Sequence, residues 1–313
     1  MLKKLLLGGG VLASVVLLAG AAFLAHTWYA RPININLFFA REALQFALQS
    51  PETLSSLRVL EPIGIRGHNA KLDNASMTAG NEVFAKARRA RDTLLSYRDE
   101  RLSEGDRMSK RIALSLLDLV TEAEAFRFHN FPLNQLFGVQ NGFPSFMEST
   151  HQIHSKRDAQ DYIARLDAVP TKFAQVMEGL EHREEIGVLP PQFVIDKVLE
   201  EMRNFVATPA DDNILLVALK DKMSEAALDE DFQTEILAQA RVSVERSVYP
   251  AYGVFIDYYE QLDAKVEHNY GAWNLPQGDA LYRLLLKFFT TTDMTPDEIH
   301  ALGLREVDRI QAE

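Results

Sequence analysis

The stretch RMSKRIALSLLDLVTEAEAFRFH, residues 107–129, decides the fold class of this chain. Its apolar residues return every three or four positions, as they do along one face of an α-helix. The stripe consists of Ile112, Leu116, Leu119, Val120, Ala123 and Phe126. Similar spacing recurs through most of the chain after residue 30, and alternation with a period of two is almost absent. The sequence therefore predicts an all-α fold, a bundle of many helices.

Caps and prolines predict where these helices begin and end. Ser50-Pro51 marks a helix start that follows a short helix around Leu37 to Leu48. Residues Glu82 to Arg101 and Arg107 to His129 are expected to form two antiparallel helices separated near Gly105.

The segment Asn130 to Thr150, NFPLNQLFGVQNGFPSFMEST, contains two prolines and two glycines without a clean period, which predicts an ordered apolar loop. Ser155 with Asp158 then resembles a helix cap. The cap predicts a helix as far as Ala168, with Pro170 starting the next one. Later helices are expected at Gln192 to Val206, at Asn213 to Ala227, and from Asp231 to Val266 with a bend near Pro250.

The last helix has a well-specified start and no stop signal. Thr295-Pro296-Asp297-Glu298 supplies an N-cap, a first-turn proline and acidic first-turn residues. An apolar stripe that includes Ile299 and Ile310 is still running at Glu313. We therefore expect the sequence to be truncated inside a helix, with a C-terminal portion of the same protein missing.

The first residues predict a membrane anchor. Lys3 and Lys4 precede an uncharged stretch from Leu5 to Ala25 that is long enough to cross a bilayer as a helix. The division expected is a membrane anchor or signal segment at residues 1–30 and one helical portion at residues 31–313. The positive-inside rule places that portion in the periplasm or at the cell exterior. The alternative is secretion after cleavage of a signal peptide.

Composition excludes several classes of function. The chain has 313 residues, no cysteine and a formal net charge of -11. Without cysteine there is neither a disulfide framework nor thiol catalysis. The acidic balance argues against a nucleic-acid partner, because a polyanion would be repelled.

The sequence contains no residue pattern that specifies a catalytic or metal site. A helical zinc hydrolase needs the motif HExxH, and none of the eight histidines is followed by glutamate. His151 and His154 have a spacing of three, but we interpret them as polar loop residues because further ligands are not evident nearby. Acidic pairs such as Asp211-Asp212 precede predicted helices, where they complement the helix dipole. We therefore assign no catalytic residue and no metal ligand.

The stretch YGAWNLPQGDALYRLLLKFFTTTDMTPDEIHALGLREVDRI, Tyr270 to Ile310, closely resembles a segment of the bacterial domain-of-unknown-function 885 family. The resemblance rests on a Gly-x-Trp-x-Leu-Pro-x-Gly element, a tyrosine-bearing helix and a Thr-Pro-x-Glu-Ile-His run. One departure is Leu281, where many relatives carry a second tyrosine. A looser resemblance extends back to about residue 35 and covers only the N-terminal portion of the family.

The resemblance implies a helical zinc metallopeptidase-like hydrolase. Its HExxH motif and a further glutamate are expected beyond Glu313, so zinc is expected in the full-length protein and none is expected to bind to this chain. This portion would form a wall of the cleft for a peptide substrate. Trp273, Gly278 and Tyr282 are the candidate substrate-binding residues, because a glycine lets backbone approach a ligand closely and aromatic rings supply contact area.

Two alternatives stay open. The element around Trp273 can equally be a packed turn that positions the next helix. The chain as a whole can be a non-catalytic helical envelope module that binds peptides or a partner protein. An HExxH motif downstream favours the enzyme, and a stop codon soon after Glu313 favours the module.

Overall fold

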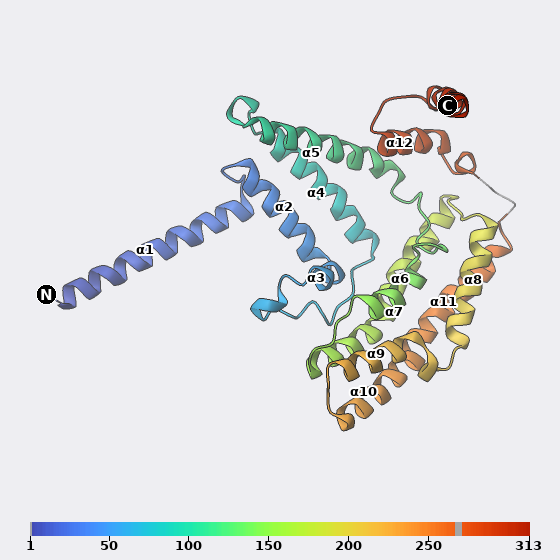
Figure 1. Ribbon diagram of the computed structural model, residues 1–313, viewed down its shortest axis with the longest axis horizontal. Coiled ribbons are helices and arrows are strands. Elements are labelled where there is room, and N and C mark those ends of the chain that lie inside the picture. Colours follow the sequence, from blue (N-terminus) through green and yellow to red (C-terminus); the bar gives the residue numbers. More distant parts are fainter. Residues whose placement is uncertain (1, 267–270) are drawn as a thin grey trace. The chain divides into compact units, whose positions relative to one another are not determined.

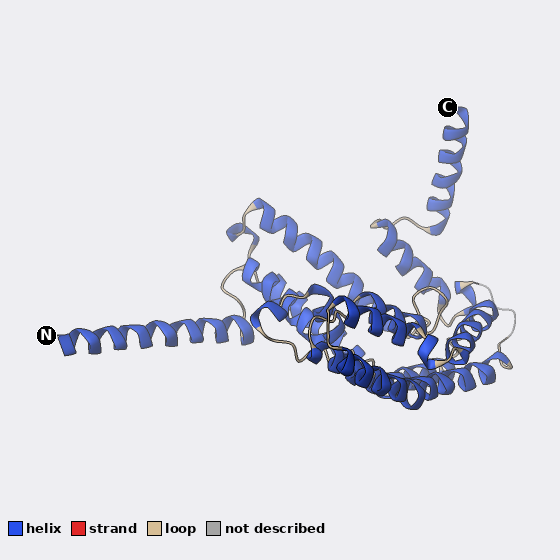
Figure 2. Cartoon of the chain, turned by 60° about the horizontal axis from the view of Figure 1, so that its bottom comes forward, coloured by secondary structure: helices blue, strands red, loops and turns tan. Residues whose placement is uncertain are grey.

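The computed structural model of the protein describes residues 2–266 and 271–313, with side chains described from residue 14 onward in those ranges. All regular structure in these two ranges is helical, and no strand occurs in them (Figure 2). The all-α prediction is confirmed. The principal helices are α1 Leu2–Tyr29, α2 Ile35–Gln49, α3 Pro51–Leu57, α4 Met77–Leu95, α5 Glu104–Ala123, α6 Val139–Ser149, α7 Lys156–Glu185, α8 Gln192–Ala207, α9 Ile214–Glu225, α10 Glu230–Ser243, α11 Tyr249–Asp263, α12 Gly278–Thr290 and α13 Pro296–Ala312 (Figure 1).

The chain forms two compact units. The first contains Met1–Gln49 and Val83–Thr121, and the second contains Ser50–Glu82 and Glu122–Glu313. These units are defined by which residues contact one another, so the division does not test the expected boundary at residue 30. A separate anchor at residues 1–30 and a single helical portion at residues 31–313 stay predictions.

The core of the first unit is small. Phe38, Leu94 and Tyr97 are buried in it, and the Tyr97 hydroxyl donates a hydrogen bond to the Pro32 carbonyl at 2.8 Å. The Arg91 guanidinium on α4 donates to Asp118 on α5, so these helices are neighbours as predicted. Gly105, predicted to separate them, instead lies in the first turn of α5, and the connection runs through residues 96–103.

The predicted stripe on α5 is only partly buried. Leu119 is 8% exposed, whereas Ile112 and Leu116 are 55% and 53% exposed. Helical spacing thus predicted the helix correctly, but it did not predict which part of the stripe another helix covers.

The core of the second unit surrounds α7. This helix packs against α10, α11 and the π-helical turn η5 (Val244–Val248) that joins them. Phe173 on α7 stacks on Phe255 of α11 with 4.5 Å between ring centroids. The π-turn lies immediately before Pro250, the residue near which a bend was predicted. A single π-turn commonly accommodates such an irregularity.

The predicted loop at Asn130 to Thr150 was wrong, because it contains α6, with Pro144 inside the helix. Proline removes the N–H that would bond to the carbonyl four residues earlier, that of Gln140. The buried Tyr252 hydroxyl donates to this carbonyl instead, at 2.5 Å. A residue 112 positions away therefore compensates for the proline, and local sequence could not show it.

The predicted break at Pro170 was also wrong, because α7 continues through it from Lys156 to Glu185. Leu166, Val169 and Phe173, on either side of the proline, are almost completely buried. Their packing outweighs the loss of one backbone hydrogen bond. The predicted cap is confirmed, since the Ser155 hydroxyl accepts a hydrogen bond from the Asp158 amide.

The N-terminal helix α1 contains the stretch predicted to anchor the chain. The first part of Leu5 to Ala25 lies outside the residues whose side chains are described. Among the residues that are described, none of the helices combines the length and the apolar character that a membrane crossing requires.

Candidate functional site

In the turn that leads into α12, two positions accept only glycine. Gly271 has φ of 125°, and a side chain there would collide with the Trp273 ring. Gly278 is buried, and a Cβ on it would overlap the Ala272 carbonyl. The 3-10 turn η6 (Ala272–Asn274) therefore lies directly against the first residue of α12. Tyr270, the first residue of the stretch that resembles the family, lies outside the described residues.

A hollow of about 620 Å³ lies between α12 and the start of α13. Four residues on one face of α12 line it, and the other walls come from residues 292–297. The four are Asp279, Tyr282, Arg283 and Lys287, whose spacing of three and four residues puts them on one side of a helix. The three charged members of this face were not singled out from the sequence, although the spacing could have identified them.

The predicted site residues lie close together in sequence but have different surroundings. Tyr282 is 47% exposed and lines the hollow. Trp273 is 75% exposed and lies over Gly271, outside the lining of the hollow. Gly278 packs beneath the turn and supports the start of α12. Their role in substrate binding stays a prediction.

Leu281, which replaces the second tyrosine of the family pattern, is buried. It is 7% exposed, whereas the adjacent Tyr282 is almost half exposed. Neighbouring residues of a helix are about 100° apart around its axis, so the two side chains point in different directions. A single tyrosine lines the hollow at this turn.

Two contacts tie the α12 segment to the last turn of α5 and to the segment after it. His129 Nε2 lies 2.8 Å from the Pro276 carbonyl oxygen, to which it can donate a hydrogen bond. Lys287 Nζ forms an ion pair with Glu122 at 2.9 Å. The predicted capping box at the start of α13 is confirmed: Thr295 and Glu298 exchange side-chain and backbone hydrogen bonds. These backbone and side-chain hydrogen bonds of Thr295 lower the pKa of the Glu298 carboxyl.

Apolar side chains remain uncovered on both helices that border the hollow. On α12, Phe288 and Phe289 are 49% and 76% exposed. All residues of α13 from Ala301 onward are exposed, including Leu304 and Ile310. Adjacent uncovered apolar side chains of this size are typical of surfaces that contact another polypeptide or a ligand.

The lining of the hollow offers charged and hydrogen-bonding groups. It contains two cations, three carboxylates, two threonine hydroxyls and the Tyr282 phenol, and no histidine. No group of three or more histidine, aspartate or glutamate side chains in the described part of the chain could hold a metal ion. His151, interpreted from sequence as a polar loop residue, is 2% exposed and buried against α7, whereas His154 is exposed.

Comparison with solved structures supports the fold. A crystal structure described as that of a "putative lipoprotein from Colwellia psychrerythraea" matches with a TM-score of 0.77 at 20% sequence identity. The match covers 85% of this chain and 47% of that one, so the chain spans about half the length of its structural relative. No curated protein matches the sequence.

A family model matches residues 60–313, which include the turn at Gly278, the hollow and all of α7 to α13. That family is described as a bacterial protein of unknown function, DUF885. The chain belongs to the DUF885 family.

Proposed function

We propose that this chain forms one wall of a peptide-binding cleft in an exported, membrane-anchored zinc metallopeptidase-like hydrolase. The proposal assigns peptide contact to the hollow at Tyr282 and assigns hydrolysis to other parts of the same protein. The observation that carries it is the uncovered apolar surface on α12 and α13, which borders a hollow with polar and charged walls. Membership of the DUF885 family supports the proposal through the peptidase-like character that the sequence resemblance implies.

The uncovered surface supports a further segment of polypeptide as its occupant. Phe289 and Ile310 each expose at least 60% of their surface. Burying side chains of this kind contributes roughly 1.5–3 kcal/mol each. The coverage of 47% of the structural relative is consistent with a larger protein in which another segment packs here.

Export is supported by α1 and by the name of the structural relative. The stretch before residue 30 follows Lys3 and Lys4, which favours a cytoplasmic N-terminus. The chain has no cysteine, so none of its residues offers a thiol for lipid attachment. The proposed anchor is therefore the α1 segment itself. Fractionation of cells and protease treatment of spheroplasts test this: tagged chain in the membrane fraction, degraded only after protease is added outside, is the expected result.

Zinc does not fit the described residues of this chain, because they contain no suitable ligand group. The proposal therefore places its ligands elsewhere in the protein and derives no step of the reaction through this chain. The contribution of these residues is to bind and orient a peptide at Tyr282 and its neighbours on α12.

The test uses protein expressed from the complete reading frame, with bound zinc measured by mass spectrometry and peptidase activity measured with a peptide library. Stoichiometric zinc and peptide hydrolysis are expected. Tyr282→Ala should raise KM for peptides and leave the zinc content unchanged. Phe137→Ala is the matched control, because Phe137 is 90% exposed and does not line the hollow.

Two outcomes would contradict the proposal. A zinc-free protein that binds peptides without hydrolysing them would favour the non-catalytic envelope module. Equal KM values for Tyr282→Ala and Phe137→Ala would show that the hollow does not contact the peptide, even in a protein that proved to be a zinc enzyme.

A further inference from the structure

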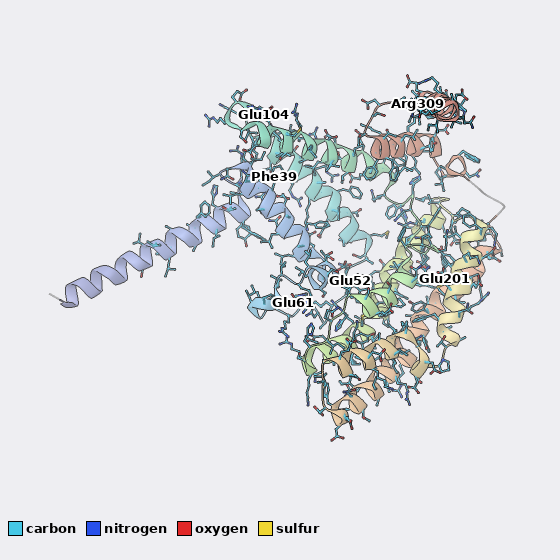
Figure 3. The ribbon with its side chains drawn as sticks, viewed as in Figure 1. Phe39, Glu52, Glu61, Glu104, Glu201 and Arg309 are labelled. Carbon is cyan, nitrogen blue, oxygen red and sulfur yellow. The ribbon has the colours of Figure 1, made fainter. Side chains whose placement is uncertain are left out.

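A loop of the second unit, residues 57–66, exposes a group of large apolar side chains. It begins at the last residue of α3 and contains the 3-10 turn η1 (Glu61–Ile63), and Figure 3 labels Glu61 within it. Four apolar side chains of the loop are each between 52% and 70% exposed: Leu57, Val59, Ile63 and Ile65. Single exposed apolar residues are common on protein surfaces, but four within nine residues form a patch.

Polar side chains hold the loop from its inner side. Glu61 Oε1 lies 2.9 Å from His68 Nε2, and these two side chains are only 11% and 6% exposed. The completely buried Arg165 of α7 donates hydrogen bonds to the Ser55 hydroxyl at 2.6 Å and to the His68 carbonyl at 3.3 Å, on either side of the loop. A loop that faces only water has the opposite arrangement, because polar groups gain from hydration and apolar groups do not.

Backbone hydrogen bonds fix the shape of the loop. Arg58, which ends α3, has a left-handed backbone with φ of 53°, and its N–H donates to the Leu54 carbonyl at 2.9 Å. Gly64 has φ of 83°, and its N–H donates to the Glu61 carbonyl at 2.9 Å. The apolar side chains are therefore held outward before any partner binds, so that contact with a partner does not require the loop to become ordered.

The loop and the residues after it are basic, although the second unit is acidic. That unit contains 20 basic and 37 acidic residues, whereas its residues 57–71 contain three basic residues and one acidic residue. The basic residues are Arg58, Arg66 and Lys71. Arg66 lies 3.6 Å from Asp158, whereas Arg58 and Lys71 are exposed. Exposed apolar side chains with Lys or Arg beside them are typical of polypeptide that contacts the surface of an anionic membrane.

We propose that the loop at residues 57–66 contacts the surface of a membrane that contains anionic phospholipid. Its apolar side chains would lie at the boundary of headgroups and acyl chains, with Arg58 and Lys71 at the phosphates. This inference rests on the membrane anchoring through α1 that is proposed above. Residues 30–56 link α1 to the loop, and most of them lie in α2 and α3, so an anchored chain keeps the loop within about 50 Å of the bilayer. The anchor makes the contact intramolecular, which allows even a weak patch to remain on the lipid.

The experiment uses a fluorescent probe at a single cysteine, because the chain has no cysteine of its own. The 313-residue chain with Ile65→Cys is labelled with bimane and reconstituted into nanodiscs of phosphatidylcholine and phosphatidylglycerol. Val254→Cys on α11 is the matched control, since Ile65 and Val254 are both 52% exposed. Lipid that is spin-labelled in its acyl chains quenches a probe that touches the bilayer. It should quench the Ile65 probe and leave the Val254 probe bright.

Variants of exposed residues separate the apolar contribution from the charge. In the Ile65→Cys chain, Ile63→Ser should lower the ratio of lipid-bound to free loop at least about tenfold, because one large side chain no longer inserts. Arg58→Gln should lower this ratio about fivefold, as expected for one cation at an anionic surface. Arg203→Gln is the control for charge, because Arg203 is an exposed arginine that is paired with Glu260 outside the loop. It should leave the ratio unchanged.

The results that would overturn the proposal also distinguish it from the anchor. An Ile65 probe that stays bright in a chain that co-elutes with the discs would exclude the loop contact and leave the anchor intact. A chain that does not enter the discs would exclude the anchor, and this inference with it. An Ile65 probe that is shielded from iodide but not quenched by lipid would assign the loop to contact with another polypeptide. Equal quenching in discs with and without phosphatidylglycerol would exclude recognition of anionic lipid.

Discussion

Replacing Tyr252 by phenylalanine tests how this fold tolerates a proline inside α6. The Tyr252 hydroxyl is completely buried and donates to the Gln140 carbonyl, whose normal helical partner would be the missing N–H of Pro144. Tyr252→Phe removes the donor and keeps the ring, which packs against Phe173 and Phe205. The carbonyl is then left buried without a partner. An unsatisfied buried acceptor costs about 1–3 kcal/mol, which is the expected fall in the free energy of unfolding.

Because the chain has two units, the assay must report on the second unit alone. Hydrogen exchange of peptides from α6 to α11, measured by mass spectrometry over a urea series, does so. Burial raises the pKa of Tyr252 well above its ordinary value, so the hydroxyl remains a donor and the loss should be the same at pH 6 and pH 9. Tyr282→Phe, which changes a half-exposed ring, should alter the free energy of unfolding by less than about 0.5 kcal/mol.

A second substitution makes the explanation refutable. Pro144→Ala restores the N–H that can bond to the Gln140 carbonyl within α6. In that background Tyr252→Phe should cost about 1 kcal/mol less than it does alone, which is a coupling that a double-mutant cycle measures directly. Equal costs in the two backgrounds, or a cost below about 0.5 kcal/mol in the unmodified chain, would show that the hydroxyl does not compensate for the proline.

Two further predictions concern Gly278 and His151. Gly278→Ala should destabilise the start of α12, because its Cβ would overlap the Ala272 carbonyl, whereas Gly303→Ala on α13 meets nothing and should stabilise its helix by up to about 1 kcal/mol. Hydrogen exchange of α12 and α13 compares the two, and equal protection would contradict the steric argument. His151 is neutral when folded, because burial lowers its pKa to about 3 from the ordinary histidine value of about 6.5, so the unfolded chain binds one more proton between these values. Its contribution to stability is complete above about pH 6.5 and is lost as the pH falls toward 3, with a slope of up to about 1.4 kcal/mol per pH unit. Urea unfolding at pH 7.5, 6 and 5 checks this. If the free energy of unfolding of His151→Asn changes with pH as steeply as that of the unmodified chain, the pH dependence comes from other groups.

Several helix boundaries were predictable from sequence because their hydrogen bonds are local. Ser50 caps α3 with Pro51 in the first turn, Asn213 caps α9, and Thr295 forms a capping box with Glu298. Each of these bonds joins residues no more than three positions apart, so a short sequence pattern contains both partners. The helical class follows for a similar reason, since apolar spacing reflects the geometry of a single helix.

The sequence determined less of the candidate sites. Tyr282 was identified and lines the hollow, but Trp273 and Gly278 do not, because the fold of the turn decides which way each residue faces. The exposed apolar patch of the loop at residues 57–66 was not foreseen. No motif marks it, because the Arg165 guanidinium that holds the loop contacts groups from Ser55 to His151, up to 110 residues away.

What the sequence by itself determined is therefore the helical class, several helix starts and the family, all of which depend on short segments. Only the tertiary structure decided that α6 forms despite Pro144, that α7 continues through Pro170, and that a charged arginine, Arg165, is completely buried in the second unit. The physical reason is the same in each case. A proline or a buried charge is unfavourable locally, and it is tolerated only where distant residues supply the missing hydrogen bonds and the packing.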